Sequence, residues 1–246
     1  MSRWLRAAAL TCGAALEVLC APAHAASFFV SPVRIDLTGS VSTAVLSVRN
    51  EAERAVVVQV QLLAWSQSHG QDRLSDTKDL IATPPLFTIP GRGAQIVRVG
   101  LRKAPAAIAK EQTYRLILQE VPPPSKPGEP GITMALRLSL PIFVAASTPK
   151  GPMLSWRAEQ AADGTLALHV ENGGDTHAQI TQLALSAAPS QRPFVELDTV
   201  SYVLAGEKRD WQLKPDPGPQ SAVRRLHLKA DTDAGRVETV LELPAR

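Results

Sequence analysis

The stretch Ile132-Thr133-Met134-Ala135-Leu136-Arg137-Leu138-Ser139-Leu140-Pro141-Ile142-Phe143-Val144 decides the fold of this chain. From position 132 to position 140 every second residue is large and aliphatic, while Thr, Ala, Arg and Ser lie between them. Alternate side chains of a β-strand point to opposite faces, so the pattern predicts a strand with one aliphatic face. That row consists of Ile132, Met134, Leu136, Leu138 and Leu140. It fits two structures, an ordinary strand that faces the core and an exposed edge strand.

A proline-rich stretch before this strand favours the edge interpretation. Pro122–Gly131 is too rich in proline for a tight hairpin turn, and it predicts an exposed loop. The strand is also long, so its first half can extend past the sheet as an edge. An exposed aliphatic edge promotes aggregation, and such edges persist where they bind another strand. The stretch therefore favours β-strand addition to another polypeptide.

Short β-rich runs make up the rest of the first half. Glycine, proline and asparagine separate the runs, and no long stretch has helical periodicity. Their number is that of an immunoglobulin-like sandwich, so we expect an all-β fold. Together with Ile132–Val144, the runs are Ser27–Leu37, Ala44–Val48, Val56–Trp65, Leu86–Ile89, Gln95–Leu101 and Tyr114–Val121.

A second domain follows a short linker. Residues 147–152, Ser-Thr-Pro-Lys-Gly-Pro, have the composition of a linker, and the β pattern restarts after them. Leu166–Asn172 is similar to Ala44–Asn50, which suggests two related sandwiches. Ala222–Lys229 and Arg236–Leu243 predict a closing hairpin. We therefore expect an N-terminal domain over residues 26–146 and a C-terminal β-sandwich over residues 153–246.

The first 25 residues have the features of a secretory signal peptide. A short basic segment leads into the apolar run Ala7–Cys20, which Glu17 interrupts, and Ala23-His24-Ala25 matches a cleavage site. The run is shorter than the ~20 residues of a membrane-spanning helix, so we expect no membrane insertion. Both cysteines, Cys12 and Cys20, lie inside the signal. The mature chain therefore has no disulfide and no thiolate chemistry.

Composition and motifs give no support to catalysis or nucleic-acid binding. The net charge of +3 over 246 residues is too small for an electrostatic case for nucleic acid. Phosphate-binding loops, nucleophile elbows and zinc-binding helix motifs are absent from the sequence. The histidines and carboxylates are scattered, so they nominate no metal site and no acid–base pair. We expect no enzyme activity, no metal and no cofactor.

The first domain resembles the periplasmic chaperones of the chaperone–usher pilus pathway, especially its archaic branch. No single motif carries the resemblance; an ordered set of segments across nearly the whole domain does. The second domain is similar mainly in size and pattern. The segments are Val30–Leu37, Val45–Asn50, Thr83–Gly91, Gln95–Val99, Tyr114–Pro122 and Ala135–Pro141.

The resemblance implies two immunoglobulin-like domains with a cleft between them, in a protein of the periplasm. It implies that the clients are pilin subunits, which lack a final strand. Donor-strand complementation would place Met134, Leu136 and Leu138 in the client's groove, with Ile132 and Leu140 at the ends of the row. The client would then pass to an outer-membrane usher without ATP. The exposed edge is also compatible with self-association of the free protein.

The resemblance further implies that two basic residues bind the client's C-terminal carboxylate. Arg34 matches the first of them by its position before Ile35. The family has a lysine on the donor strand as the second, and this sequence departs from that pattern. Arg137 is the best substitute, although a register two residues later places Ser139 there. Arg115 is a further candidate, on the neighbouring strand.

Two other function classes remain as alternatives. One is an exported β-sandwich adhesin or carbohydrate-binding module, against which the aromatic content of 4% argues. The other is a secreted hydrolase with a site that no motif reveals. The client, the pilus type, the domain angle and the oligomeric state do not follow from the sequence.

Overall fold

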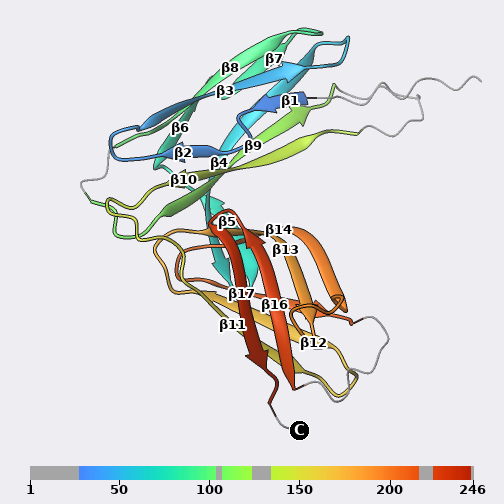
Figure 1. Ribbon diagram of the computed structural model, residues 1–246. Helices are drawn as coiled ribbons and strands as arrows, with labels where there is room; N and C mark the ends of the chain where they lie inside the picture. The colour runs from blue at the N-terminus through green and yellow to red at the C-terminus, as the bar shows by residue number, and fades with distance from the viewer. Residues whose placement is uncertain (1–27, 104–106, 124–133, 216–223, 245–246) are drawn as a thin grey trace, which may run out of the picture.

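A computed structural model describes residues 28–103, 107–123, 134–215 and 224–244, and every regular element in these ranges is a β-strand (Figure 1). The predicted all-β fold is thereby confirmed. The predicted signal peptide, most of the predicted proline-rich loop and Ile132 lie outside the described residues. The strands are β1 (Phe28–Ser31), β2 (Ile35–Leu37), β3 (Thr43–Asn50), β4 (Val56–Ser68), β5 (Gln71–Asp76), β6 (Leu80–Thr83), β7 (Leu86–Ile89), β8 (Ala94–Leu101), β9 (Gln112–Val121), β10 (Arg137–Val144), β11 (Leu154–Gln160), β12 (Leu166–Asn172), β13 (Ala178–Ser186), β14 (Val195–Val203), β15 (Lys208–Leu213), β16 (Arg225–Thr232) and β17 (Gly235–Glu242).

The first ten strands form two sheets that enclose one core. One sheet has the order β1-β3-β8-β6, and the other has the order β2-β10-β9-β4-β5, with β7 also paired to β4. Alternating residues point inward, as Val56, Val58 and Val60 do on β4. They pack against residues such as Leu46 on the opposite sheet, which is fully buried. The hydrophobic effect thus holds the two sheets together.

The predicted run Ser27–Leu37 is two strands in different sheets. β1 pairs with β3 and β2 pairs with β10, and Pro32 lies between β1 and β2. Proline has no N–H to donate to a ladder, so it suits a point where a chain leaves one sheet for the other. The break places Arg34 immediately before β2, next to β10.

The β4–β5 hairpin extends from the first sandwich to the second, as the teal strand in Figure 1 shows. The side chain of Gln67 on β4 donates to the carbonyl of Tyr202 at 2.8 Å and accepts from the N–H of Leu204 at 3.0 Å. Arg209 of the second sandwich forms an ion pair with Asp72 at 3.6 Å. The sequence pattern did not predict β5. All of its side chains are exposed, and its one apolar residue, Leu74, is too little to give an alternating pattern. This hairpin connects the two sandwiches.

The remaining seven strands form the second sandwich. Its sheets have the orders β11-β12-β15 and β14-β13-β16-β17, all antiparallel. The predicted closing hairpin is present as β16 and β17. The core contains Leu168 and Val170 of β12 together with Ile180 and Leu183 of β13. In the described part of the chain no helix is long and apolar enough to cross a membrane.

Asn50 and Asn172, the last residues of the two similar segments, have the same structural role. Both side chains are fully buried. Asn50 Nδ2 donates to the carbonyls of Arg54 and Pro90 at 2.7 and 3.1 Å, and Asn172 Nδ2 donates to those of Thr176 and Val203 at 2.8 and 3.1 Å. A buried amide with its hydrogen bonds formed stabilises the turns around it. The internal similarity in sequence therefore reflects one turn-stabilising device used twice.

Candidate functional site

The strand β10 has a free edge over its first half. It pairs with β9 along its whole length, whereas β2 covers its other edge only from Ile142 to Val144. No described residue pairs with that edge between Arg137 and Pro141. We call this segment, 137–141, the free edge. It is about 16 Å long at ~3.3 Å per residue, which is room for one additional short strand.

The backbone hydrogen bonds show which groups the free edge presents. Glu120 donates its N–H to the carbonyl of Leu136 at 2.9 Å, and Leu136 donates its N–H to Glu120 Oε2 at 3.0 Å. In an antiparallel pair the residues that bond to one neighbour alternate with those that face away. Arg137 and Ser139 therefore point their backbone groups to the free edge, and Pro141 has no N–H at its end.

The strand begins at Arg137, whereas the pattern predicted a beginning at Ile132. β9 ends at Val121, and Leu136 is the first residue before β10 that forms a hydrogen bond with the backbone of β9. The carboxylate of Glu120 accepts the N–H of Leu136 in place of a ladder carbonyl, so the regular ladder stops there.

The aliphatic row changes from exposed to buried along its length. Met134 is 77% exposed, Leu136 and Leu138 are partly buried, and Leu140 is 8% exposed within the first core. Ile132 lies outside the described residues. Both interpretations of the pattern thus apply to one strand, because its end faces the core while its beginning extends beyond it.

An aromatic cluster lies where the two sandwiches meet, on the opposite face of β10. It consists of Trp65, Phe143, Leu204 and Tyr202, and we call it the junction cluster. Trp65 and Phe143 have ring centroids 6.0 Å apart, and the Tyr202 ring meets Trp65 edge-on at 5.3 Å. The first two residues belong to the first sandwich and the other two to the second. The cluster therefore joins the donor-strand candidate to both domains.

Arg34 lies on this cluster. Its guanidinium is 4.8 Å from the centroid of the Phe143 ring. Its Nε donates to both oxygens of Asp36 at 2.9 and 3.1 Å, and its Nη1 donates to Asp233 of the second sandwich at 3.2 Å. Burial works against the charge, but these two carboxylates outweigh it and raise the pKa of Arg34. Among the described residues Nη2 has no partner, so one side of the fork is available to a ligand.

Arg115 lies on the same cluster from β9. It pairs across the ladder with Pro141, and its guanidinium is 3.6 Å from the centroid of Trp65. Burial lowers the pKa of Arg115, and the nearby carboxylate of Asp72 offsets this only in part. No hydrogen bond or ion pair to its guanidinium occurs within the described ranges. A partly desolvated cation without a bound carboxylate is well suited to binding one.

Arg137 lies elsewhere on the strand. It is exposed, and it is four residues from Pro141, about 13 Å at the rise of a strand. The structure therefore brings Arg34 and Arg115 to the junction cluster and leaves Arg137 near the beginning of β10. The sequence shows only that Arg115 lies in a β-rich run. Its position near the end of the free edge follows from the register of β9 against β10.

His177 is a site residue that no sequence pattern indicated. Its ring stacks on Phe143 with centroids 3.6 Å apart and an interplanar angle of 9°. Nδ1 is 2.7 Å from Glu111 Oε1, and Nε2 is 3.4 Å from Asp233 Oδ2, the contact of an ion pair. The side chains of His177 and Glu111 are 4% and 5% exposed. Arg34 and His177 thus both contact Phe143 and Asp233.

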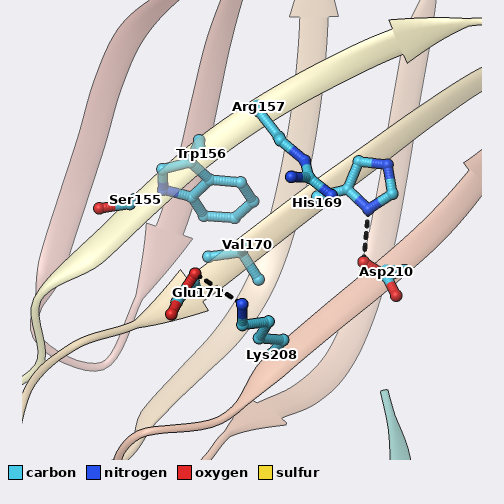
Figure 2. A pocket seen from close by; sticks show the side chains of 8 residues that line it. All are labelled: Ser155, Trp156, Arg157, His169, Val170, Glu171, Lys208 and Asp210. Carbon is cyan, nitrogen blue, oxygen red and sulfur yellow. Dashed lines mark hydrogen bonds and ion pairs between the residues drawn. The ribbon is translucent and has the colours of Figure 1, made fainter. Parts of the chain in front are cut away.

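A small pocket lies apart from this site, on the second sandwich. Figure 2 shows its side chains on β11, β12 and β15, where Glu171 pairs with Lys208 at 3.0 Å and His169 with Asp210 at 2.5 Å. Its remaining cation, Arg157, pairs with Glu159 at 3.8 Å. The charges of the pocket are therefore satisfied within the protein. No group of three or more metal-ligating side chains occurs among the residues that the structure describes.

The comparison with family models identifies the family. Residues 27–150 match the pili and flagellar-assembly chaperone family, in its PapD N-terminal domain. The chain belongs to this family of assembly chaperones, as its sequence resemblance predicted. No curated protein matches the chain in sequence.

Solved structures with the same fold include three chaperones or their complexes. A chain of the CsuC–CsuE chaperone–tip adhesion subunit pre-assembly complex from Acinetobacter baumannii has a TM-score of 0.65 at 17% identity, with 89% of this chain and 100% of that one covered. A chain of the Salmonella enterica SafA pilin–SafB chaperone complex has a TM-score of 0.62 at 17% identity, covering 89% and 98%. The E. coli chaperone DraB has a TM-score of 0.57 at 18% identity, covering 87% and 98%. The predicted pair of immunoglobulin-like sandwiches is confirmed.

Proposed function

We propose that this protein is a periplasmic chaperone that binds and protects pilin subunits by donor-strand complementation and delivers them, without ATP, to an outer-membrane usher. The observation that carries the proposal is the free edge of β10, which has an aliphatic row on one face and two arginines at its end. The solved complexes of similar fold contain a tip adhesion subunit or a pilin, which supports a client of this class. The match to the Csu chaperone supports the archaic branch.

The geometry supports one arrangement for the C-terminal strand that the client does have. It would pair with the backbone groups of Arg137 and Ser139 and end where β2 begins to cover the edge at Ile142. Arg34 immediately precedes β2, and Arg115 lies across from Pro141. A C-terminal carboxylate therefore reaches the two arginines only if the client's strand runs parallel to β10.

The aliphatic row would supply the apolar part of the binding energy. Met134, Leu136 and Leu138 are at least partly exposed in the free protein, so a client's groove can bury them further. Full burial of such a side chain is worth about 1.5–3 kcal/mol. Leu140 already packs in the chaperone's own core, and its role would be to keep the strand in place.

Arg34 and Arg115 together form the proposed carboxylate anchor. Among the described residues no side chain binds Arg34 Nη2, and none provides a carboxylate in contact with the Arg115 guanidinium. Guanidinium groups bind carboxylates through two parallel hydrogen bonds, so two of them can hold one terminal carboxylate. Arg137, which the resemblance suggests as the second anchor, lies about 13 Å along the strand from Pro141, so Arg115 is the nearer partner for Arg34.

The proposal is tested by co-expressing the protein with a pilin subunit from the same genome in the periplasm. In the double variant Met134→Asp, Leu136→Asp the subunit should no longer co-purify and should be degraded, because two charges cannot enter an apolar groove. The control is Val200→Asp, at an apolar residue of β14 that is 71% exposed. If the double variant still protects the subunit while it folds normally, the donor-strand assignment is wrong.

A further inference from the structure

His177 of the second sandwich occupies an unusual position in the proposed anchor. The side chains of Arg34, Phe143 and His177 form a continuous set of contacts: the guanidinium lies 4.8 Å from the Phe143 centroid, and the imidazole stacks on that ring at 3.6 Å. Asp233 Oδ2 joins the ends of this set, 3.2 Å from Arg34 Nη1 and 3.4 Å from His177 Nε2. The imidazole is therefore coupled to Arg34 both through the ring and through a shared carboxylate.

The charges around this set balance only when His177 is protonated. The facing cations are Arg34 and Arg115, and the facing anions are Asp36, Asp233 and Glu111. Asp72 also acts on Arg115, but its charge is balanced by its ion pair with Arg209. Tyr202, whose ring centroid is 5.7 Å from that of His177, has a pKa raised above its ordinary value by burial and stays neutral. A neutral His177 thus leaves one excess negative charge, which opposes the arrival of another carboxylate.

The geometry around His177 favours the protonated form of its ring. Two carboxylates from different sandwiches contact the two ring nitrogens. Burial by itself lowers the pKa of His177, but the contacts with Asp233 and Glu111 outweigh burial and raise it. Burial by itself raises the pKa of Asp233, but its contacts with His177, the N–H of Gln179 and Arg34 outweigh burial and lower that pKa to about 2, so Asp233 is charged at neutral pH.

We propose that His177 is a positioning residue for the carboxylate anchor: its imidazolium balances Asp233 and supports Phe143, so that Arg34 can accept the client's C-terminal carboxylate, and its deprotonation weakens that binding. The inference rests on the proposed function, because it deepens the anchor of the same site. The client affinity would therefore depend on the pH of the periplasm. Below the pKa of His177 in the folded protein the anchor is competent, and above it the anchor loses affinity.

The test uses a fluorescent ten-residue peptide of alternating Val and Thr with a free C-terminal carboxylate, and the same peptide amidated. Its affinity for the full mature chain is measured by anisotropy between pH 5.5 and 9. The free-carboxylate peptide should lose roughly threefold to tenfold in affinity as pH rises, the scale expected for one nearby charge at intermediate dielectric. The amidated peptide should show no such loss. His177→Gln should have a flat profile at the weaker affinity, while the control His227→Gln, on β16, should keep the wild-type profile.

A second variant separates the positioning role from a purely structural one. Glu111→Gln keeps the imidazole but removes one of its carboxylates, so the midpoint of the profile should move to lower pH. A pH dependence retained in His177→Gln, or a midpoint unmoved in Glu111→Gln, overturns the inference. If Arg34→Ala binds both peptides as the wild type does, the anchor itself is wrong, and that result differs from a failure of His177 alone.

Discussion

Replacement of Arg115 by methionine is the sharpest test of where the second basic anchor lies. Methionine keeps an apolar stem over Trp65 and removes the charge, so the fold should be retained. A hydrogen bond to a charged group contributes about 1.5–3 kcal/mol when it is shielded from water, and Arg115 is partly buried at the junction cluster. At 1.4 kcal/mol per factor of ten, the variant should bind a free C-terminal carboxylate about 10- to 100-fold more weakly.

The matched control is Arg137→Met on the exposed beginning of β10. An exposed ion pair is worth about 0–1 kcal/mol, so its affinity should fall by less than about fivefold. The assay is peptide anisotropy at pH 6.5, with the free and the amidated peptide compared for each variant, because only the carboxylate-dependent part reports on the anchor. An Arg137→Met loss equal to or greater than that of Arg115→Met refutes the placement argued from the ladder register.

Three further outcomes follow from packing and charge. Leu140→Ala should destabilise the free protein by about 2–5 kcal/mol in a denaturant titration, since it opens a cavity in the first core, whereas Met134→Ala should leave the midpoint unchanged because Met134 is exposed. Asn50→Ala should cost about 1–3 kcal/mol in the same measurement, because the carbonyls that its amide serves lose their partner; an unchanged midpoint would contradict its turn-stabilising role. The stability that His177 contributes should be fully present below its unfolded pKa of about 6.5 and be lost as pH rises through its raised folded pKa, so a wild-type curve without this decline, relative to His177→Gln, would contradict the ion pairing.

Much of the fold could be predicted from local patterns. Val56–Trp65 and Leu166–Asn172 alternate because one face of each strand is buried, and that periodicity is visible in the residues themselves. The pattern did not predict β5, because its side chains are all exposed and leave no alternation. It also joined β1 and β2 into one run, because adjacency in the chain does not reveal that Pro32 divides two sheets.

Only the aliphatic row and Arg34 of the candidate site could be predicted from the sequence. The aliphatic row of Met134, Leu136 and Leu138 follows from period-two alternation, and Arg34 was named through its place in a family pattern. Glu111 and His177 are 66 residues apart and carry no local signal, yet they meet at 2.7 Å. Arg115 is a candidate anchor because it lies opposite Pro141, and that pairing is set by the register between β9 and β10.

By itself the sequence determined the all-β class, the alternating strand that we propose as the binding edge and the family to which the chain belongs. These depend on side-chain order along one strand or on an ordered set of segments. Only the tertiary structure decided which part of β10 is free, which residues stay in the chaperone's own core and which charges surround the proposed anchor. Those depend on β2, β9 and the second sandwich, because a strand's open edge and a buried charge are defined by neighbours that lie far away in the chain.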